Sequence, residues 1–256
     1  WESLEPFFKE LVDRPLGSLQ DLEQWLKDMS EVEAVISEDA CWRQIKMTCD
    51  TTDKSLEDAF TFFCMEIQPQ MQPYADALNR KLIHSPYTAQ LDQAKYHTYL
   101  RSVQKSIELF RTENIPIQAE LSVLQQQYGT IAGKMTIEVG GKEYTLQQAA
   151  QFLENEDRAF REEVYRKIQT RRLQDQAAMH DLFTSLVQKR HQVALNAGFE
   201  NYRDYKFKEL GRFDYTKEDC FQFHEAVKLH VLPIIDKIYA RKKRRQSKSD
   251  KRQGQR

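Results

Sequence analysis

The stretch DRAFREEVYRKIQTRRLQDQAAMHDLFTSLVQKRHQVALNAG, residues 157–198, decides the fold class of this chain. Its apolar residues recur every three or four positions as Phe160, Val164, Ile168, Ala178, Leu182, Leu186, Val193 and Ala197. This period is typical of one buried face of an α-helix. Residues 169–176 contain a single apolar residue, Leu173, so we expect a kink or a solvent-spanning turn there. Gly198 is expected to end the helix.

A different pattern precedes this stretch. Residues 134–139 and 142–145 alternate in polarity, carry Thr, Ile, Val and Tyr, and flank the pair Gly140-Gly141. Two glycines accept the positive φ angles of a tight turn between antiparallel strands. We therefore expect one β-hairpin over about residues 134–145, followed by a helix with Thr145 as its N-cap and Gln148 completing a capping box.

The residues upstream of the hairpin have the helical period. Ser18 is a candidate N-cap, and the apolar residues after it recur on one face as Leu19, Leu22, Trp25, Leu26 and Met29. We expect further helices over about residues 31–49, 55–68, 71–83, 88–112 and 116–129, with Ser55 as the cap of the helix that Pro69 ends. Downstream, Thr216 and Asp219 predict another helix start. This last helix should bend at Pro233.

Composition agrees with a helical protein. The 256 residues are 40% hydrophobic and 30% charged, with eight glycines, seven prolines and a mean hydropathy of −0.72. These values exclude a collagen-like or Gly/Ser-disordered chain and argue against a β-sandwich. No apolar run approaches the roughly eighteen residues that a membrane helix needs. We expect a soluble, helical protein without a membrane partner.

Charge is distributed unevenly along the chain. Residues 241–256 hold nine Lys/Arg and one acid, Asp250, whereas the other 240 residues hold 29 basic and 38 acidic side chains. The body is therefore acidic, with a net charge of −9, and the tail carries +8. An acidic body argues against nucleic-acid binding, which needs clustered positive charge. We expect the basic tail to be disordered and solvated rather than a nuclear-localisation or RNA-binding arm.

The cysteines form no metal or redox motif. Cys41, Cys49, Cys64 and Cys220 contain no C-x-x-C pair and lie at no zinc-finger spacing from a histidine. Three of them fall inside helical apolar patterns, where a free cysteine behaves as a small hydrophobe. We expect reduced core thiols rather than disulfides or metal ligands.

One segment comes close to a catalytic motif. In His-Glu-x-x-His, two imidazoles at i and i+4 bind zinc and the Glu acts as general base. Here His224-Glu225 is followed by Lys228 at the i+4 position, and an ammonium is not a ligand. His230 at i+6 points away from His224 on a regular helix. We therefore expect a helix-face histidine and no stoichiometric zinc.

Other constellations also predict structure rather than chemistry. The pairs Glu154/Glu156 and Glu162/Glu163 lie in helical charge runs, which are typical of solvated faces. The tyrosines of residues 202–215 are expected to pack in the core. The chain has no Gly-x-Ser-x-Gly elbow and no phosphate-binding Gly-rich loop. From the residues alone, no catalytic, substrate-binding or metal-ligating residue is assigned.

Several segments together resemble a known enzyme family. They occur in order as residues 22–26, 49–53, 113–116, 133–136, 141–145, 157–158, 196–205 and 212–215. The sequences NAGFENYRDY (196–205) and RFDY (212–215) are the most specific of them. Over about residues 1–243 the chain is similar to the N-terminal half of the oligoendopeptidase F branch of the thimet-oligopeptidase-like zinc metallopeptidases. The resemblance implies a cytoplasmic, mainly α clamshell that hydrolyses short peptides with one zinc ion.

The resemblance also implies what this chain lacks. In that family the zinc-binding His-Glu-x-x-His, the further Glu ligand and the assisting His and Tyr lie downstream of the matched segments, so no position here corresponds to them. We expect a helical-bundle lobe of a peptidase that is inactive alone, and whether the chain is itself an enzyme stays open. Residues 241–256 are expected to be a truncated or out-of-frame end.

The expected organisation has four parts. They are an N-terminal helical region (1–117), an oligopeptidase N-terminal domain with the hairpin and long helix (118–210), the start of the catalytic domain (211–240) and the basic tail (241–256). A lobe without its partner should expose apolar surface around residues 221–238 and self-associate through it. The alternative is a stand-alone helical interaction module that binds an acidic partner through its tail or through grooves between helices.

Overall fold

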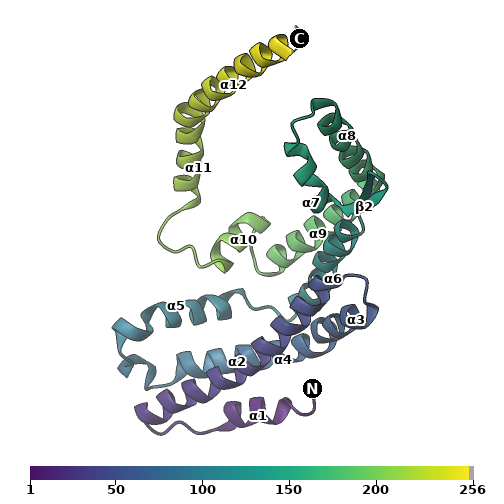
Figure 1. The fold of residues 1–256 in the computed structure, drawn as a ribbon. Helices are drawn as coiled ribbons and strands as arrows, with labels where there is room; N and C mark the ends of the chain where they lie inside the picture. Colours follow the sequence, from purple (N-terminus) through teal and green to yellow (C-terminus); the bar gives the residue numbers. More distant parts are fainter. Residues whose placement is uncertain (254–256) are drawn as a thin grey trace. The chain divides into compact units, whose positions relative to one another are not determined.

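The protein is described from a computed structural model that covers the backbone of residues 1–253 and the side chains of residues 1–245. It is mainly α-helical and contains one two-stranded antiparallel hairpin, which confirms the expected fold class. The chain divides into two compact units, Trp1–Lys206 and Phe207–Arg256, called here the first and second unit. The helices of both are drawn in Figure 1.

The first part of the first unit is a set of helices. They are α1 (Glu5–Asp13), α2 (Leu19–Cys49), α3 (Lys54–Phe62), the π-helical turn η1 (Phe63–Ile67), α4 (Gln68–His84), the 3₁₀ turn η2 (Thr88–Gln90) and α5 (Gln93–Leu109). α1 and α5 both pack against α4, and α3 packs against α2. Within this unit, Figure 1 draws α1 below α2 and α4.

The rest of the first unit carries the hairpin. Its elements are α6 (Asn114–Gly133), β1 (Thr136–Val139), β2 (Lys142–Thr145), α7 (Leu146–Ala149), the 3₁₀ turn η3 (Ala150–Glu154), α8 (Arg158–Gln174), α9 (Gln176–Asn196) and α10 (Tyr202–Glu209), whose end reaches into the second unit. α6 and α9 make the most extensive helix pair of the unit. The expected kink is confirmed, because Asp175 lies between α8 and α9, and Gly198 has a φ of 86°.

The hairpin has the expected turn and register. Ile137 pairs with Tyr144 and Val139 pairs with Lys142, so Gly140 and Gly141 form the two-residue loop. Their φ angles are 61° and 77°, as a type I′ turn requires. The predicted capping box after the hairpin is present, because the Thr145 side chain accepts from the Gln148 backbone and Gln148 bonds back.

Three clusters of buried side chains hold the first unit together. One joins α1, α2, α4 and α5 and includes Trp25, Leu22 and Leu82, which are fully buried. The second joins α6, α9 and α10, and the third lies between the hairpin, α7 and α8. The predicted stripe supplies Val164 and Ile168 of α8 to the third cluster and Leu182, Leu186 and Val193 of α9 to the second. It was wrong at Ala178, which is exposed, and it missed Ala194, which is fully buried.

Several predicted helix boundaries are wrong. Residues 19–49 form one helix rather than two, and α1 was not anticipated. Asp53, not Ser55, caps α3, because its carboxylate accepts from the Ser55 backbone at 2.8 Å. Pro69 does not end a helix: the chain passes from α3 through η1 into α4, where Pro69 stands in the first turn. The helical chain continues past Pro69 because the turn before it widens, with the Gln68 backbone donating to the Phe63 carbonyl.

The second unit contains α11 (Lys217–Ala226), the π-helical turn η4 (Val227–Val231) and α12 (Leu232–Gln253). The predicted capping box of Thr216 and Asp219 is present. Helix α12 continues through the basic segment, in contrast to the disordered tail expected from residue 241. Lys, Arg, Gln and Ser are tolerated in helices, and no Gly or Pro interrupts residues 241–253. Residues 254–256 of the expected tail lie outside the described residues.

Candidate functional site

The near-motif at His224 has no metal-binding geometry. His224 is exposed, and its ring lies 6.4 Å from those of Phe221 and Phe223 on its own helix. Lys228 occupies the position of the missing second histidine and forms an ion pair with Glu225 at 3.6 Å. Within the residues that the structure describes, no three His, Cys, Asp or Glu side chains gather as a potential metal site. His224, Glu225 and Lys228 therefore do not form a zinc-binding set.

The acidic pairs on α8 and before it behave as solvated groups. Glu162 accepts from Arg166 at 2.7 Å and Glu163 pairs with Lys167 at 2.7 Å, both one turn away on the same helix. Glu154 and Glu156 are exposed. These contacts are the ordinary i, i+4 pairs of a helix surface. The carboxylates of Glu162 and Glu163 thus have the environment of solvated groups on a helix surface.

The cysteines only partly match the prediction of core thiols. All four are free, but Cys41 and Cys49 are exposed on α2 and Cys220 is half-buried. Cys64 alone is buried, and this burial raises the pKa of its thiol. The apolar pattern misled at Cys41 and Cys49, because the second half of α2 buries only Ile36 and Met47.

A cavity of about 470 Å³ opens between α2, the α3–η1 segment and α6 in the first unit. Its apolar wall includes the buried side chains Met47, Phe63 and Cys64. The remaining wall of the cavity carries mainly hydroxyl and amide groups. They come from residues 37–51 in and just after α2, from Gln68 of α4, and from residues 122–130 of α6. None of the described lining residues is charged. The volume lies within the range of small-ligand pockets.

Gln126 is the unusual residue of this cavity. Its side chain is 9% exposed, and neither its amide nitrogen nor its amide oxygen has a hydrogen-bond partner in the described part of the chain. Its neighbour Gln125 differs, because its amide donates to the Leu121 carbonyl at 3.0 Å. Buried amides are almost always bonded, so an unbonded one in a neutral cavity marks a place where a ligand could supply the partners.

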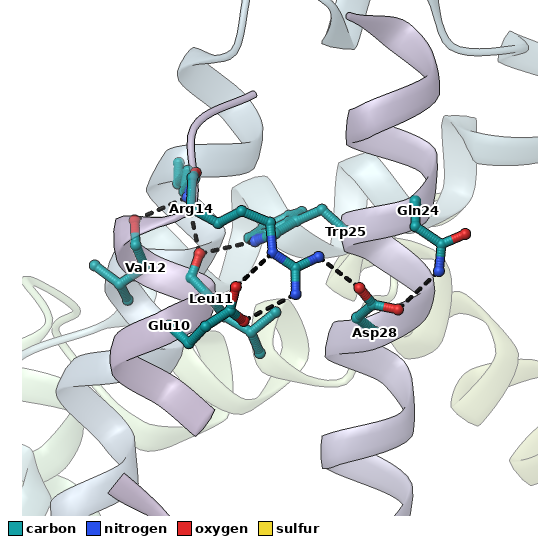
Figure 2. A network of polar contacts seen from close by, with 8 residues as sticks. Glu10, Leu11, Val12, Arg14, Gln24, Trp25 and Asp28 are labelled. Carbon is teal, nitrogen blue, oxygen red and sulfur yellow. Dashed lines mark hydrogen bonds and ion pairs between the residues drawn. The ribbon is translucent and has the colours of Figure 1, made fainter. Parts of the chain in front are cut away.

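A polar network at the end of α1 is the other conspicuous cluster (Figure 2). The Arg14 guanidinium donates through two nitrogens to the Glu10 carboxylate, at 2.8 Å each, and through the third to Asp28. Gln24 donates to the other oxygen of Asp28 at 2.8 Å. Hydrogen bonding to Arg14 lowers the pKa of both Glu10 and Asp28.

The backbone next to this network is also capped. Lys81 of α4 donates to the carbonyls of Leu11, Val12 and Arg14, and the Trp25 indole donates to Leu11 at 2.8 Å. Carbonyls at the end of a helix lack intrahelical partners, and these side chains supply them. Desolvation and the nearby Arg14 lower the pKa of Lys81. These bonds join α1 to α2 and α4, and Arg14 and Lys81 also line a shallow cavity of about 540 Å³ at the surface.

Large apolar side chains are exposed on the second unit. They include Phe223 at 67%, Leu229 at 64%, Ile234 at 57% and Ile238 at 46%. The sequence predicted exposure in this region, at residues 221–238. Of the tyrosines expected to pack in the core, Tyr205 is 3% exposed, but Tyr215 is 45% exposed. None of the described helices has both the length and the apolar character that crossing a bilayer demands.

The sequence reasoning missed both Gln126 and the Arg14 network. The Glu10–Arg14 spacing is an i, i+4 signal that could have been noticed. No local signal distinguishes Gln126, which is the middle of three consecutive glutamines on α6.

Comparisons with known proteins identify the family. The Peptidase M3 N-terminal domain matches residues 1–110, and Peptidase family M3 matches residues 151–255. No curated protein is significantly similar in sequence.

Solved structures share the fold. A protein assigned as oligoendopeptidase F from Bacillus anthracis str. Ames has a TM-score of 0.86 at 21% identity, over 91% of this chain and 43% of that chain. PZ peptidase A with inhibitor 2 gives 0.86 at 22% identity, over 91% of this chain and 42% of that one. Another structure assigned as oligoendopeptidase F, at 3.1 Å, gives 0.88 at 24% identity, over 94% and 43%.

The chain thus spans less than half the length of these structures, and the likeness shows the fold alone. Together the two M3 matches cover most of the sequence, on both sides of the hairpin. The chain belongs to peptidase family M3 and has the fold of the N-terminal part of oligoendopeptidase F structures.

Proposed function

We propose that this chain forms the N-terminal helical part of an oligoendopeptidase F-like zinc peptidase that hydrolyses short peptides in the cytoplasm. The observation that carries the proposal is the agreement in fold over 91–94% of the chain, together with M3 matches on both sides of the hairpin. The division into a helical region, a hairpin-bearing domain from about residue 118 and the start of a catalytic domain near residue 211 belongs to the same proposal.

In this proposal, residues outside those described here bind the catalytic zinc ion. His224 and Lys228 do not form a ligand pair, and the described residues contain no alternative ligand set. The chain's own contribution is therefore structural: it supplies helices and the hairpin against which a zinc-bearing partner part would assemble. Alone, it should be inactive.

Complementation tests this proposal. The purified chain is assayed with an internally quenched peptide, alone and with the C-terminal part of the Bacillus anthracis protein, each with and without chelator. We expect hydrolysis only in the mixture, and we expect chelator to abolish it. Chelator-sensitive hydrolysis by the chain alone would contradict inactivity, and a mixture that binds without hydrolysing would contradict the proposed assembly.

The exposed apolar side chains of the second unit favour a second candidate, a helical interaction module. Under this alternative the chain binds an acidic partner or itself without any catalytic partner. Self-association through this surface is expected of a lobe without its partner as well, so complementation separates the two candidates. Failed complementation, together with binding of an acidic peptide that weakens as salt is raised, would favour the interaction module.

A further inference from the structure

The starting observation is the buried, unbonded amide of Gln126. Removing an amide from water without replacing its hydrogen bonds destabilises a fold by about 1–3 kcal/mol. Among the described residues, none donates a hydrogen bond to the amide oxygen of Gln126 and none accepts one from its amide nitrogen. The packing around Gln126 therefore does not require an amide at this position. The donor and acceptor of Gln126 are therefore left for something that enters the cavity.

The chemistry of the cavity limits what can enter. No lining residue among those described is charged, so nothing compensates a charge on the ligand. The Gln126 amide presents one donor and one acceptor side by side. The complementary group carries a C=O and an N–H on one side, as one residue of an extended peptide or a primary carboxamide does.

The walls favour an aliphatic group next to that polar pair. Met47, Phe60 and Phe63 line the cavity, and a second cavity of about 280 Å³ continues along α2. The two share the lining residues Ser37, Ala40, Phe63 and Gln68. The second cavity adds further apolar side chains, including Ile36, Met71 and Leu78. It also contains the carboxyl of Glu33, whose pKa is raised by burial, so it offers no positive charge to an anionic ligand.

We propose that this cavity is a binding site for a neutral ligand in which an N–H and a C=O on one side, paired with Gln126, adjoin an aliphatic group. The site lies wholly within the first unit and takes no part in the zinc chemistry of the proposed function. It would hold a ligand whether or not a catalytic part is present.

Titration calorimetry of the whole chain with three probes tests the ligand chemistry. N-acetyl-leucine N-methylamide carries the N–H and C=O of an extended peptide residue, and 4-methylpentanamide carries a primary carboxamide. The third probe is the depsipeptide analogue of the first, in which an ester oxygen replaces the leucine N–H. We expect at least one of the first two to bind, and their relative affinities distinguish the peptide source from the carboxamide source. If the peptide binds, the analogue should bind about tenfold more weakly or worse, because it lacks the donor to Gln126.

Two variants locate the site. Gln126→Leu keeps the size of the side chain, removes the amide and should weaken binding about tenfold or more without lowering the melting temperature. Gln127→Leu is the matched control: Gln127 is adjacent, exposed and outside the cavity, so binding should not change. If Gln126→Leu does not fold, the unaltered chain decides: weaker binding of the depsipeptide than of the peptide would still show that the ligand N–H bonds at this site. If the variant does not fold and the two probes bind equally, the amide is structural and the proposal fails.

The cysteines provide an internal readout. Cys41 lines the cavity, whereas Cys49 lies on the same helix outside it, and both are exposed. A saturating probe should slow alkylation of Cys41 by N-ethylmaleimide and leave Cys49 unchanged, as measured by peptide mass spectrometry. Absence of binding by both N–H-bearing probes, equal binding to Gln126→Leu, or equal slowing at both cysteines would overturn the proposal and leave a cavity that holds water only. None of these measurements involves hydrolysis, so failure here leaves the proposed function untouched, and the reverse also holds.

Discussion

The two π-helical turns of this protein share one local cause and have opposite surroundings. In η1 the Gln68 backbone donates to the Phe63 carbonyl, and in η4 that of Leu232 donates to Val227. In both, the next residue is a proline, Pro69 or Pro233. A proline inside a helix has no N–H and collides with the carbonyl four residues earlier. Widening the preceding turn to an i, i+5 bond relieves this conflict at Pro69 and Pro233, whereas Pro73 lies inside α4 without a π-helical turn.

The packing of the two turns differs completely. Phe63, Cys64 and Ile67 of η1 are buried in the first unit, whereas η4 has no buried residue. This holds for the units as a whole: among residues 1–245, none beyond Tyr205 is buried. The comparison teaches that a short sequence signal sets the local conformation and that the surrounding chain decides whether that conformation supports a core.

Truncating one large aromatic side chain in each unit should give the largest difference. Trp25 is fully buried and its indole is hydrogen-bonded to Leu11, so Trp25→Ala should lower the free energy of unfolding by about 3–5 kcal/mol. Phe223 is 67% exposed, and Phe223→Ala should change it by less than about 0.5 kcal/mol. Urea denaturation followed by circular dichroism measures both. Equal losses would mean that the second unit has a core of its own.

The hairpin turn tests how much a local conformation matters within the packed unit. Val at both Gly140 and Gly141 should cost on the order of 2–4 kcal/mol, because both positions have positive φ, which strains a β-branched residue. Gly140→Asn should be nearly neutral, since Asn-Gly suits a type I′ turn. Thermal unfolding of the three proteins measures the effect. A double Val variant as stable as the parent would show that the loop relaxes without strain.

Replacing each proline by alanine tests the shared cause of the π-turns. Replacing a proline inside a regular helix raises the free energy of unfolding by up to about 3 kcal/mol. Because the wide turn already removes part of the conflict, we expect an increase of about 1 kcal/mol for each variant. Pro233→Ala should convert η4 to a regular helix, because nothing buried holds it. Pro69→Ala should keep η1, because a change in register would rotate Phe63, Cys64 and Ile67 out of the core. Backbone NMR shifts of residues 63–68 and 227–232 report both outcomes, and loss of η1 with retention of η4 would contradict this account.

Charge pairs should give the smallest difference. Arg14 lowers the pKa of Glu10 and Asp28, so its contribution is present above their unfolded pKa values of about 4 and is lost as pH falls through the lower folded values. The stability difference between the parent and Arg14→Gln should therefore shrink as pH falls below about 4. Lys228→Gln, which breaks an exposed pair in the second unit, should have no measurable effect at any pH. Urea midpoints across this pH range measure both. A constant difference for Arg14→Gln would mean that it acts through packing instead.

Local patterns alone established much of this fold. The period of Val164 to Ala197, the glycine pair of the hairpin and the caps at Ser18, Thr145 and Thr216 depend on neighbours within a few residues, so they could be found in the sequence. The errors occurred where distant contacts intervene. Residues 19–49 stay one helix because α2 packs against α1 and α3, and the burial pattern of α2 changes along its length.

The candidate site lay beyond local patterns for the same reason. Gln125, Gln126 and Gln127 are chemically identical and adjacent on α6, and their sequence gives no reason to choose among them. Gln126 is buried where η1 and α4 pack against α6, while Gln125 and Gln127 remain exposed. The sequence by itself determined where helices, strands and turns form, because backbone and side chain compete for bonds over a few residues. The tertiary structure decided which of the three glutamine side chains is buried, because burial depends on chain segments far apart in the sequence.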